Sequence, residues 1–278
     1  ALVVTPTSVT VYLNGVSSTH TTNTSAVDIP TLKIGSYKGW TSRNFNGEID
    51  EVCLWNRSLS QNEIRELRHL TRTGPVAYDE DLVVYYQYNL PGSGSVMDRV
   101  GLQHASLAGD AQKVLSTAPV GGGVSDRVNV SSGATYMWTS SATKIDFGST
   151  NPNGQVVVTR LNVLPDSLPN TNPHAANYWI VNNYGSTTNF AALSHLKLKP
   201  AVGQPYGNPN DAVLWIRNQN EHLNNWTASC SADNFDDGYY DYTSFCGINN
   251  MSQFFIQSAD TQPIVGAYLV ANEAEVLC

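Results

Sequence analysis

Acidic side chains alternate along one short segment of this chain, Glu48-Ile49-Asp50, and Glu51 follows directly. A retaining glycosidase needs two carboxyl groups about 5 to 5.5 Å apart on one face. In an extended strand Glu48 and Asp50 share a face, but apolar Val52 comes next on it. Glu51 points to the other face unless a bulge intervenes. We therefore expect these carboxylates to support a turn or bulge, without catalysis.

A second acidic cluster runs from Asp233 to Gly238 and includes Asp236 and Asp237. Hard cations such as calcium bind clustered oxygen ligands. Phe235, however, interrupts the ligand pattern of an EF-hand loop. We expect a solvated turn and no cofactor; calcium held by Asp233, Asp236 and Asp237 is the alternative.

Two cysteines, Cys230 and Cys246, bracket this acidic loop. A disulfide that closes about 15 residues stabilises a fold by about 3 kcal/mol in the loop-entropy estimate. The four cysteines form no CxxC pair and no zinc spacing with histidine, so we expect disulfides, with reduced thiols as the alternative. Cys53 and Cys278 are a second candidate pair, although the sequence does not determine the connectivity.

Aromatic side chains gather in and near the same loop, at Trp226, Tyr239, Tyr240 and Tyr242. Such side chains stack on sugar rings or anchor protein contacts. We expect these four to be ligand-binding residues; the alternative is that the alternating tyrosines pack on a sandwich core.

No other constellation of residues points to catalysis. The six histidines are scattered, and the chain has no nucleophile elbow and no phosphate-binding loop. The sequence predicts that the protein is not an enzyme.

Composition and charge narrow the classes of partner. Charged residues make up only 14% of the 278 residues, the net charge is −8, and no lysine or arginine cluster is present. Nucleic-acid binding depends on neutralising phosphates, so we expect no nucleic-acid partner. No apolar run reaches the roughly 18 to 20 residues that span a bilayer, so we expect no membrane span.

The first part of the chain has clear strand and helix signals. Alternating apolar residues at 9–13 precede Asn14-Gly15, which indicates a strand entering a hairpin turn. Further strands are expected at 32–36 and 46–55, the latter with a bulge near Asp50 and Glu51 that turns Cys53 away from the core. Ser60 and Glu63 form a capping box, which predicts one short helix near 60–70.

The second part shows short strands separated by turn-rich loops. A strand at 82–88 leads to the glycines at 121–123, which we interpret as a flexible domain boundary. Strands then follow at 134–138, 155–163, 177–182, 190–198, 212–218 and 253–258. The pattern predicts an all-β fold with a second β-sandwich over 124–260, followed by a linker or the start of a further element at 261–278.

The segment from Phe45 to Ile64, preceded by Val11–Gly15 and Leu32–Gly35, resembles the C-terminal part of laminin-G/pentraxin-like domains, which are concanavalin A-like jelly rolls. The resemblance implies that residues 1–120 are the C-terminal part of such a sandwich with its trailing segment. Laminarinase-type relatives carry three alternating carboxylates, of which the third is missing here. The pentraxin calcium site is not carried over either, because the stretch 36–44 has no carboxylate.

Residues 82–120 and the second module are similar to segments of large surface proteins of Bacteroidota. This likeness implies an extracellular or cell-surface adhesin or structural filament that contacts glycans or other subunits. The alternative is a carbohydrate-binding accessory region of a secreted hydrolase. A half sandwich leaves an apolar face and open strand edges, so we expect the rest of the chain or another chain to supply the missing half.

Overall fold

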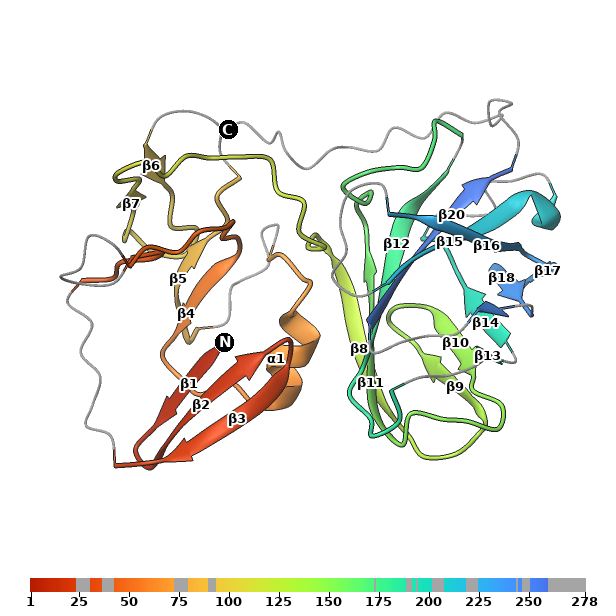
Figure 1. The fold of residues 1–278 in the computed structure, drawn as a ribbon, viewed down its shortest axis with the longest axis horizontal. Coiled ribbons are helices and arrows are strands. Elements are labelled where there is room, and N and C mark those ends of the chain that lie inside the picture. The colour runs from red at the N-terminus through yellow and green to blue at the C-terminus, as the bar shows by residue number, and fades with distance from the viewer. Residues whose placement is uncertain are drawn as a thin grey trace. The chain divides into compact units, whose positions relative to one another are not determined.

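The computed structural model describes residues 1–23, 31–36, 43–72, 80–89, 94–172, 174–188, 192–193, 195–201, 208–218, 225–243, 245–246 and 251–259. Strands dominate these residues, which confirms the predicted all-β class (Figure 1). Contacts divide the chain into two compact units. One comprises Ala1–Arg65 with Arg72–Ser116, and the other comprises Glu66–Thr71 with Thr117–Cys278.

The first unit is built from short antiparallel strands. Its three-stranded sheet has the order β1-β2-β3, and β4 pairs with β5 and β6 with β7. The bounds are β1 (Leu2–Thr5), β2 (Ser8–Leu13), β3 (Val16–Thr21), β4 (Val52–Trp55), β5 (Leu82–Tyr86), β6 (Ser95–Val96) and β7 (Ala105–Ser106). Asn14 and Gly15 both have positive φ, 52° and 77°, as the predicted hairpin turn requires.

The helix α1 (Gln61–Leu67) begins at the predicted capping box. The Glu63 backbone N–H donates to Ser60 Oγ at 3.3 Å, and the Ser60 N–H donates to Glu63 Oε2 at 2.7 Å. Two donors that a helix start leaves unpaired are thereby satisfied. Arg65 Nε donates to the Gly15 carbonyl at 3.0 Å and so ties the helix to the β2–β3 turn.

One face of the β1–β3 sheet is apolar and exposed. The ladder places Leu2 opposite Val11 and Leu13 opposite Val16, so these side chains share a face. The exposed side chains on it are Leu2 (64%), Val4 (36%), Val11 (52%), Leu13 (76%) and Val16 (61%). An exposed apolar face is what we predicted for a half sandwich.

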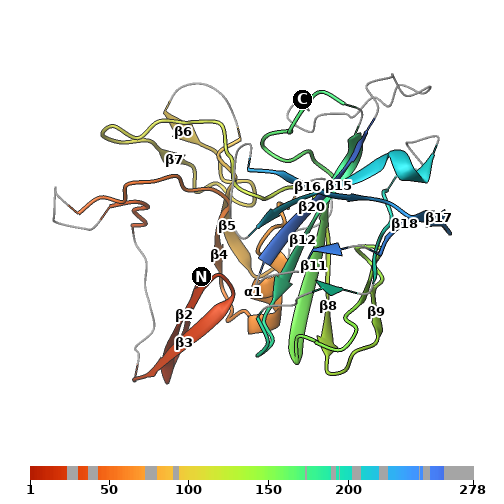
Figure 2. The same cartoon turned by 45° about the vertical axis from the view of Figure 1, so that its right-hand side comes forward.

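The second unit consists of two antiparallel sheets, seen in Figures 1 and 2. The six-stranded sheet has the order β16-β15-β20-β12-β11-β8, and the five-stranded sheet has the order β17-β18-β14-β10-β9. The bounds are β8 (Gly123–Val130), β9 (Thr135–Trp138), β10 (Thr143–Asp146), β11 (Gly154–Leu161), β12 (His174–Asn183), β14 (His195–Leu198), β15 (Ala212–Asn218), β16 (Thr227–Ser231), β17 (Asn234–Asp236), β18 (Tyr239–Tyr242) and β20 (Met251–Ser258). A separate pair is formed by β13 (Ala192–Leu193) and β19 (Phe245–Cys246), and a 3-10 turn covers Pro209–Asp211.

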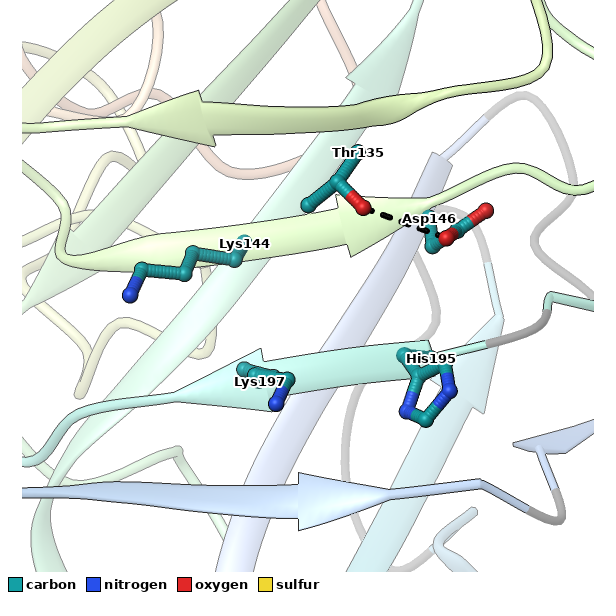
Figure 3. A pocket seen from close by; sticks show the side chains of 5 residues that line it. All are labelled: Thr135, Lys144, Asp146, His195 and Lys197. Carbon is teal, nitrogen blue, oxygen red and sulfur yellow. Dashed lines mark hydrogen bonds between the residues drawn. The ribbon is translucent and has the colours of Figure 1, made fainter. Parts of the chain in front are cut away.

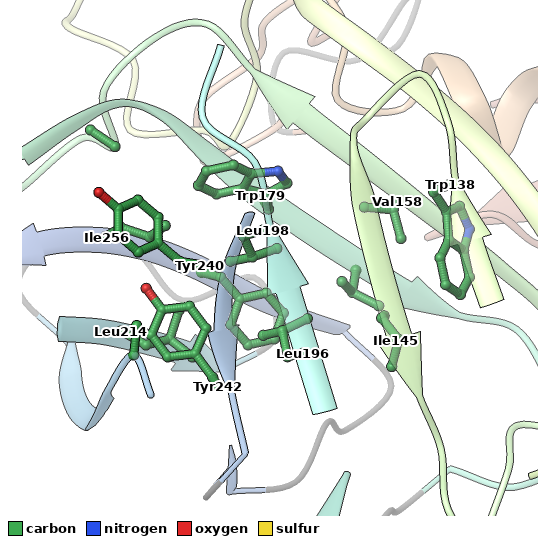
Figure 4. Close-up of a cluster of buried hydrophobic side chains, with 14 of the residues drawn as sticks. Trp138, Ile145, Val158, Trp179, Leu196, Leu198, Leu214, Tyr240, Tyr242 and Ile256 are labelled. Carbon is green, nitrogen blue, oxygen red and sulfur yellow. The ribbon is translucent and has the colours of Figure 1, made fainter. Parts of the chain in front are cut away.

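The core of this unit lies between the two sheets (Figure 4). Both sheets contribute fully buried side chains, including Trp138, Ile145, Val158, Trp179, Leu196 and Tyr240. The two buried indole N–H groups are satisfied, because Trp138 donates to the Val156 carbonyl at 3.1 Å and Trp179 to the Ser141 carbonyl at 3.2 Å. Burial of each such side chain stabilises the fold by roughly 1.5–3 kcal/mol.

The outer face of the six-stranded sheet is also covered. Tyr178, Ile180, Phe255 and Leu161 form a second apolar cluster with Trp226. Leu164 and Leu168 of the loop after β11, and Leu70 of the 66–71 segment, pack against this cluster. The outer face of the five-stranded sheet is therefore the sandwich surface available for contacts in the described part of the unit.

The glycines at 121–123, which we expected to form a flexible boundary, lie in close contact with their neighbours. Gly121 donates to the His69 carbonyl at 3.1 Å and accepts from Thr71 N at 2.9 Å. A Cβ at Gly121 would lie 2.5 Å from Val163 Cγ2, and one at Gly123 would lie 2.2 Å from the Arg160 carbonyl oxygen. Glycine fits at both positions because the Val163 side chain at Gly121 and the Arg160 backbone at Gly123 leave no room for a Cβ.

Candidate functional site

The Glu48–Glu51 segment does not form the alternating carboxylate strand of a glycosidase. Strand β4 begins only at Val52. Glu51 has a backbone φ of +51°, which residues other than glycine rarely adopt. Asp50 Oδ1 accepts the Glu51 backbone N–H at 2.9 Å. The predicted irregularity therefore falls at Glu51, and Cys53 is exposed as expected.

The Glu51 carboxyl is used inside the first unit. Its Oε2 accepts the hydroxyl of buried Tyr85, which itself accepts from Arg72 N at 2.8 Å and Gln87 Nε2 at 3.0 Å. Burial is the main cause that raises the pKa of Glu51 to about 7. The hydrogen bond from Tyr85 acts to lower this pKa, and the Asp50 charge acts to raise it. The geometry assigns this carboxyl a structural task.

This carboxyl predicts a pH dependence for the first unit. Because the folded pKa of about 7 lies above the ordinary 4.5, Glu51 contributes stability that is fully present below pH 4.5 and is lost as the pH rises through 7. We expect the loss to be at most about 3 kcal/mol. Hydrogen exchange of the β4–β5 amides measures it. Glu51→Gln should flatten the profile between pH 4.5 and 7, and an unchanged slope in this variant would refute the assignment.

The acidic loop forms a hairpin turn between β17 and β18. Asp237 and Gly238 have φ of 50° and 81°, the combination of a type I′ turn. Asp233 Oδ2 accepts from Thr243 N at 2.8 Å and from Thr243 Oγ1 at 2.6 Å, and the Asp237 carbonyl accepts Lys199 Nζ at 2.7 Å. Within the described residues no three His, Cys, Asp or Glu side chains converge to hold a metal ion. The geometry thus gives no support to calcium at Asp233, Asp236 and Asp237.

The disulfide predictions are not decided by the described residues. Cys230 is half-buried in β16, which contacts β19, the strand that contains Cys246. The Cys246 side chain and the whole of Cys278 lie outside the described residues. The Cys230–Cys246 pair and the Cys53–Cys278 pair therefore stay predictions.

The structure contradicts the predicted ligand-stacking role of the four aromatic residues. Tyr240 and Tyr242 are fully buried in the sandwich core, where Figure 4 shows Tyr240 beside Ile256 and Tyr242 beside Leu214. Trp226 is buried beneath Arg217 and donates Nε1–H to the Ser167 carbonyl at 2.8 Å. Tyr239 is buried too, and Lys144 lies 4.2 Å from its ring centroid. None of these rings offers a free face to a sugar.

The structure instead brings polar residues together on the outer face of the five-stranded sheet. Thr135, Lys144, Asp146, His195 and Lys197 surround an open depression of about 220 Å³ (Figure 3). Strand alternation places these residues there, because their neighbours Ile145 and Leu196 point into the core. The ladder sets Lys144 opposite Lys197 and Asp146 opposite His195.

Both carboxylates at this depression are engaged. Asp241 Oδ1 lies 3.0 Å from His195 Nδ1, and its Oδ2 lies 2.8 Å from Lys197 Nζ. Asp146 accepts Thr135 Oγ1 at 3.1 Å and the Gly148 N–H at 2.9 Å. Lys144 makes no ion pair with any described residue.

Sequence reasoning missed this group of residues. The stretch 190–198 was expected to be a strand, but 143–146 was not, so the two facing rows could not be paired. The available signal was the alternation of apolar and polar residues at 143–146 and 195–198.

A comparison with known families finds a match for the first part of the chain. Residues 1–65 match the Laminin_G_3 family, described as the concanavalin A-like lectin/glucanases superfamily. This match confirms the predicted jelly-roll similarity for these residues. Laminin-G-like domains are generally non-catalytic, commonly bind glycans or other proteins, and are typically extracellular. Neither the curated proteins nor the solved structures yield a match to the chain.

Of the described helices, none combines the length and apolarity needed to cross a membrane.

Proposed function

We propose that this chain is a non-catalytic segment of an extracellular adhesin or structural filament, and that it contacts glycans or neighbouring subunits through the outer face of the five-stranded sheet. One observation carries the proposal. The other outer face of the sandwich is covered by the loop after β11 and by residues 66–71, whereas this one holds an open polar depression. Function is argued from this site, because a sandwich fold alone hosts many activities.

The conformation of Glu51 supports the absence of catalysis. A general acid and a nucleophile must both face the scissile bond. The Glu51 carboxyl accepts the Tyr85 hydroxyl, and Asp50 accepts the Glu51 N–H. Neither carboxyl is arranged for attack on a sugar.

A second candidate function is a carbohydrate-binding accessory region of a secreted hydrolase. The mixture of amino, carboxylate, imidazole and hydroxyl groups around the depression favours it, since sugars present both donors and acceptors. The full precursor sequence separates the two functions: tandem copies would favour the filament, and a hydrolase domain would favour the accessory role.

An occluding variant tests the proposed surface. Thr135→Tyr places a bulky side chain at the exposed rim of the depression, and Thr21→Tyr on β3 is the matched control. On a glycan array and against immobilised copies of the chain, the wild type and Thr21→Tyr should bind, and Thr135→Tyr should bind at least about tenfold more weakly. Absence of any binding, or equal binding by all three proteins, would overturn the proposal.

The exposed apolar face of β1–β3 gives a separate prediction. We propose that another sheet covers this face in the assembled protein, because contiguous exposed apolar patches mark interaction sites. The free chain should bind an apolar fluorescent dye. Val11→Thr combined with Leu13→Lys should reduce the fluorescence by roughly a third to a half, since it changes two of the five exposed side chains. Ser17→Lys, on the opposite face, should leave it unchanged; a parallel fall would contradict the assignment.

A further inference from the structure

We infer that the depression on the five-stranded sheet binds an anionic oxygen group, the carboxylate or sulfate of an acidic saccharide, beside the lysines Lys144 and Lys197 that line it. This inference rests on the proposed function and names the ligand class of the same surface.

The first argument is a surplus of hydrogen-bond donors. Both oxygens of Asp241 and both oxygens of Asp146 already accept from neighbouring groups. Lys144 keeps all three of its N–H groups, and Lys197 keeps two after its bond to Asp241. A ligand that enters the depression therefore meets the free N–H groups of both lysines, which an acceptor on the ligand can satisfy.

The second argument is the charge pattern across the ladder. Lys144 lies directly opposite Lys197, and like charges in this position destabilise a sheet. Asp241 pairs with Lys197 and His195, while the Lys144 ammonium lies over the Tyr239 ring at 4.2 Å. A bound anion near either ammonium group would reduce the repulsion. Proteins keep locally unfavourable residue pairs mainly at functional sites.

The third argument is the distribution of lysine in an acidic protein. The chain has a net charge of −8 and only six lysines. Two of the six line this depression. Lys199 comes directly after β14, and its Nζ lies 5.3 Å from the Tyr239 ring centroid. Because Lys197 is paired with Asp241 and Lys199 donates to the Asp237 carbonyl, the Lys144 ammonium is the charge that attracts an anion locally, and salt screens the attraction.

Calorimetric titration with matched saccharides tests the inference. The probes are an oligogalacturonate and its full methyl ester, which share a backbone but differ in charge, and dextran sulfate beside neutral dextran. We expect each acidic probe whose group fits to bind about tenfold more tightly than its neutral partner, since a charge-assisted hydrogen bond contributes about 1.5–3 kcal/mol. Comparison of the two acidic probes shows whether the depression prefers a carboxylate or a sulfate.

Three variants locate the effect. Lys144→Gln and Lys197→Gln should each weaken acidic binding about tenfold, and Lys144→Gln should leave the unfolding temperature equal or higher because it removes the repulsion. Lys33→Gln removes the same charge from an exposed position in the first unit and should have no effect. If the affinity for the acidic probes fell equally in all three variants, net charge alone would explain the effect and the inference would be overturned.

The outcomes distinguish this inference from the proposed function. Equal binding of acidic and neutral probes, blocked by Thr135→Tyr but not by Lys144→Gln, would overturn the anionic ligand and leave the binding surface standing. No binding of any probe, together with an empty glycan array and no self-association, would overturn both.

Discussion

Replacement of Arg217 by methionine should lower the free energy of unfolding of the second unit by about 3–5 kcal/mol. Arg217 and Asp166 form a buried ion pair, with side chains 1% and 4% exposed and Nη1 2.5 Å from Oδ1. Gln253 Oε1 accepts Arg217 Nε at 3.2 Å and Nη2 at 2.7 Å, and the guanidinium lies 4.4 Å from the Trp226 ring centroid. The variant would leave the Asp166 carboxylate buried without the guanidinium that pairs with it, which accounts for the size of the loss.

Chemical denaturation of the whole chain measures this effect. Arg127→Met in the same unit is the control, because Arg127 and Glu66 form a partly exposed pair that should contribute at most about 1 kcal/mol. The double variant Arg217→Met with Asp166→Leu should recover much of the loss, since removal of both charges leaves none unpaired. A loss below about 1 kcal/mol for Arg217→Met would show that the pair is not buried in solution.

Acid should destabilise the second unit through His69. This histidine is 2% exposed, and Nδ1 lies 2.8 Å from the Pro119 carbonyl; since a carbonyl only accepts, Nδ1 carries the proton. Burial, helped by the Arg68 charge, lowers the His69 pKa from 6.5 to about 3. The unfolded chain therefore binds a proton that the folded chain excludes. The stability contribution is complete above pH 6.5 and is lost as the pH falls toward 3, by about 4 to 5 kcal/mol at most.

The His69→Asn variant isolates this contribution. Asparagine keeps an N–H donor for the Pro119 carbonyl and does not titrate. Unfolding free energies measured from pH 7 to pH 4 should fall more steeply for the wild type, by about 1.4 kcal/mol for each pH unit below 6.5. Parallel curves for the two proteins would show that His69 takes up its proton without unfolding.

Local signals in the sequence predicted local structure well. The capping box of Ser60 and Glu63 and the turn at Asn14-Gly15 depend on residues a few positions apart, and both form as predicted. The strand at 46–55 was expected to bulge near Asp50 and Glu51, because strict alternation would place Ile49 on the opposite face from Val52 and Leu54.

Features that depend on distant contacts could not be predicted. Asp166 and Arg217 are 51 positions apart, and residues 66–71 join the second unit through Gly121 and the cluster around Tyr178. No local pattern encodes either contact. The glycines at 121–123 look the same in sequence whether they are flexible or closely packed.

The candidate site was only partly accessible to sequence reasoning. Alternation along β18 places Tyr240 and Tyr242 on the core face and Asp241 on the outer face. The alternation of side chains along a strand could therefore have distinguished the core tyrosines from the surface residues. The placement of Lys144, Lys197 and His195 around one depression needed the β10–β14 register, which only the fold supplies.

The most direct test of the binding surface is an NMR titration of the chain with its lysines reductively methylated, a change that retains their charge. The six lysines and the N-terminal amine give seven signals, and the lysine signals can be assigned by substitution. With a saccharide from the array that binds, the signals of Lys144 and Lys197 should shift in proportion to saturation, while that of Lys33 should stay in place. Saturating binding that leaves Lys144 and Lys197 unmoved would contradict the account.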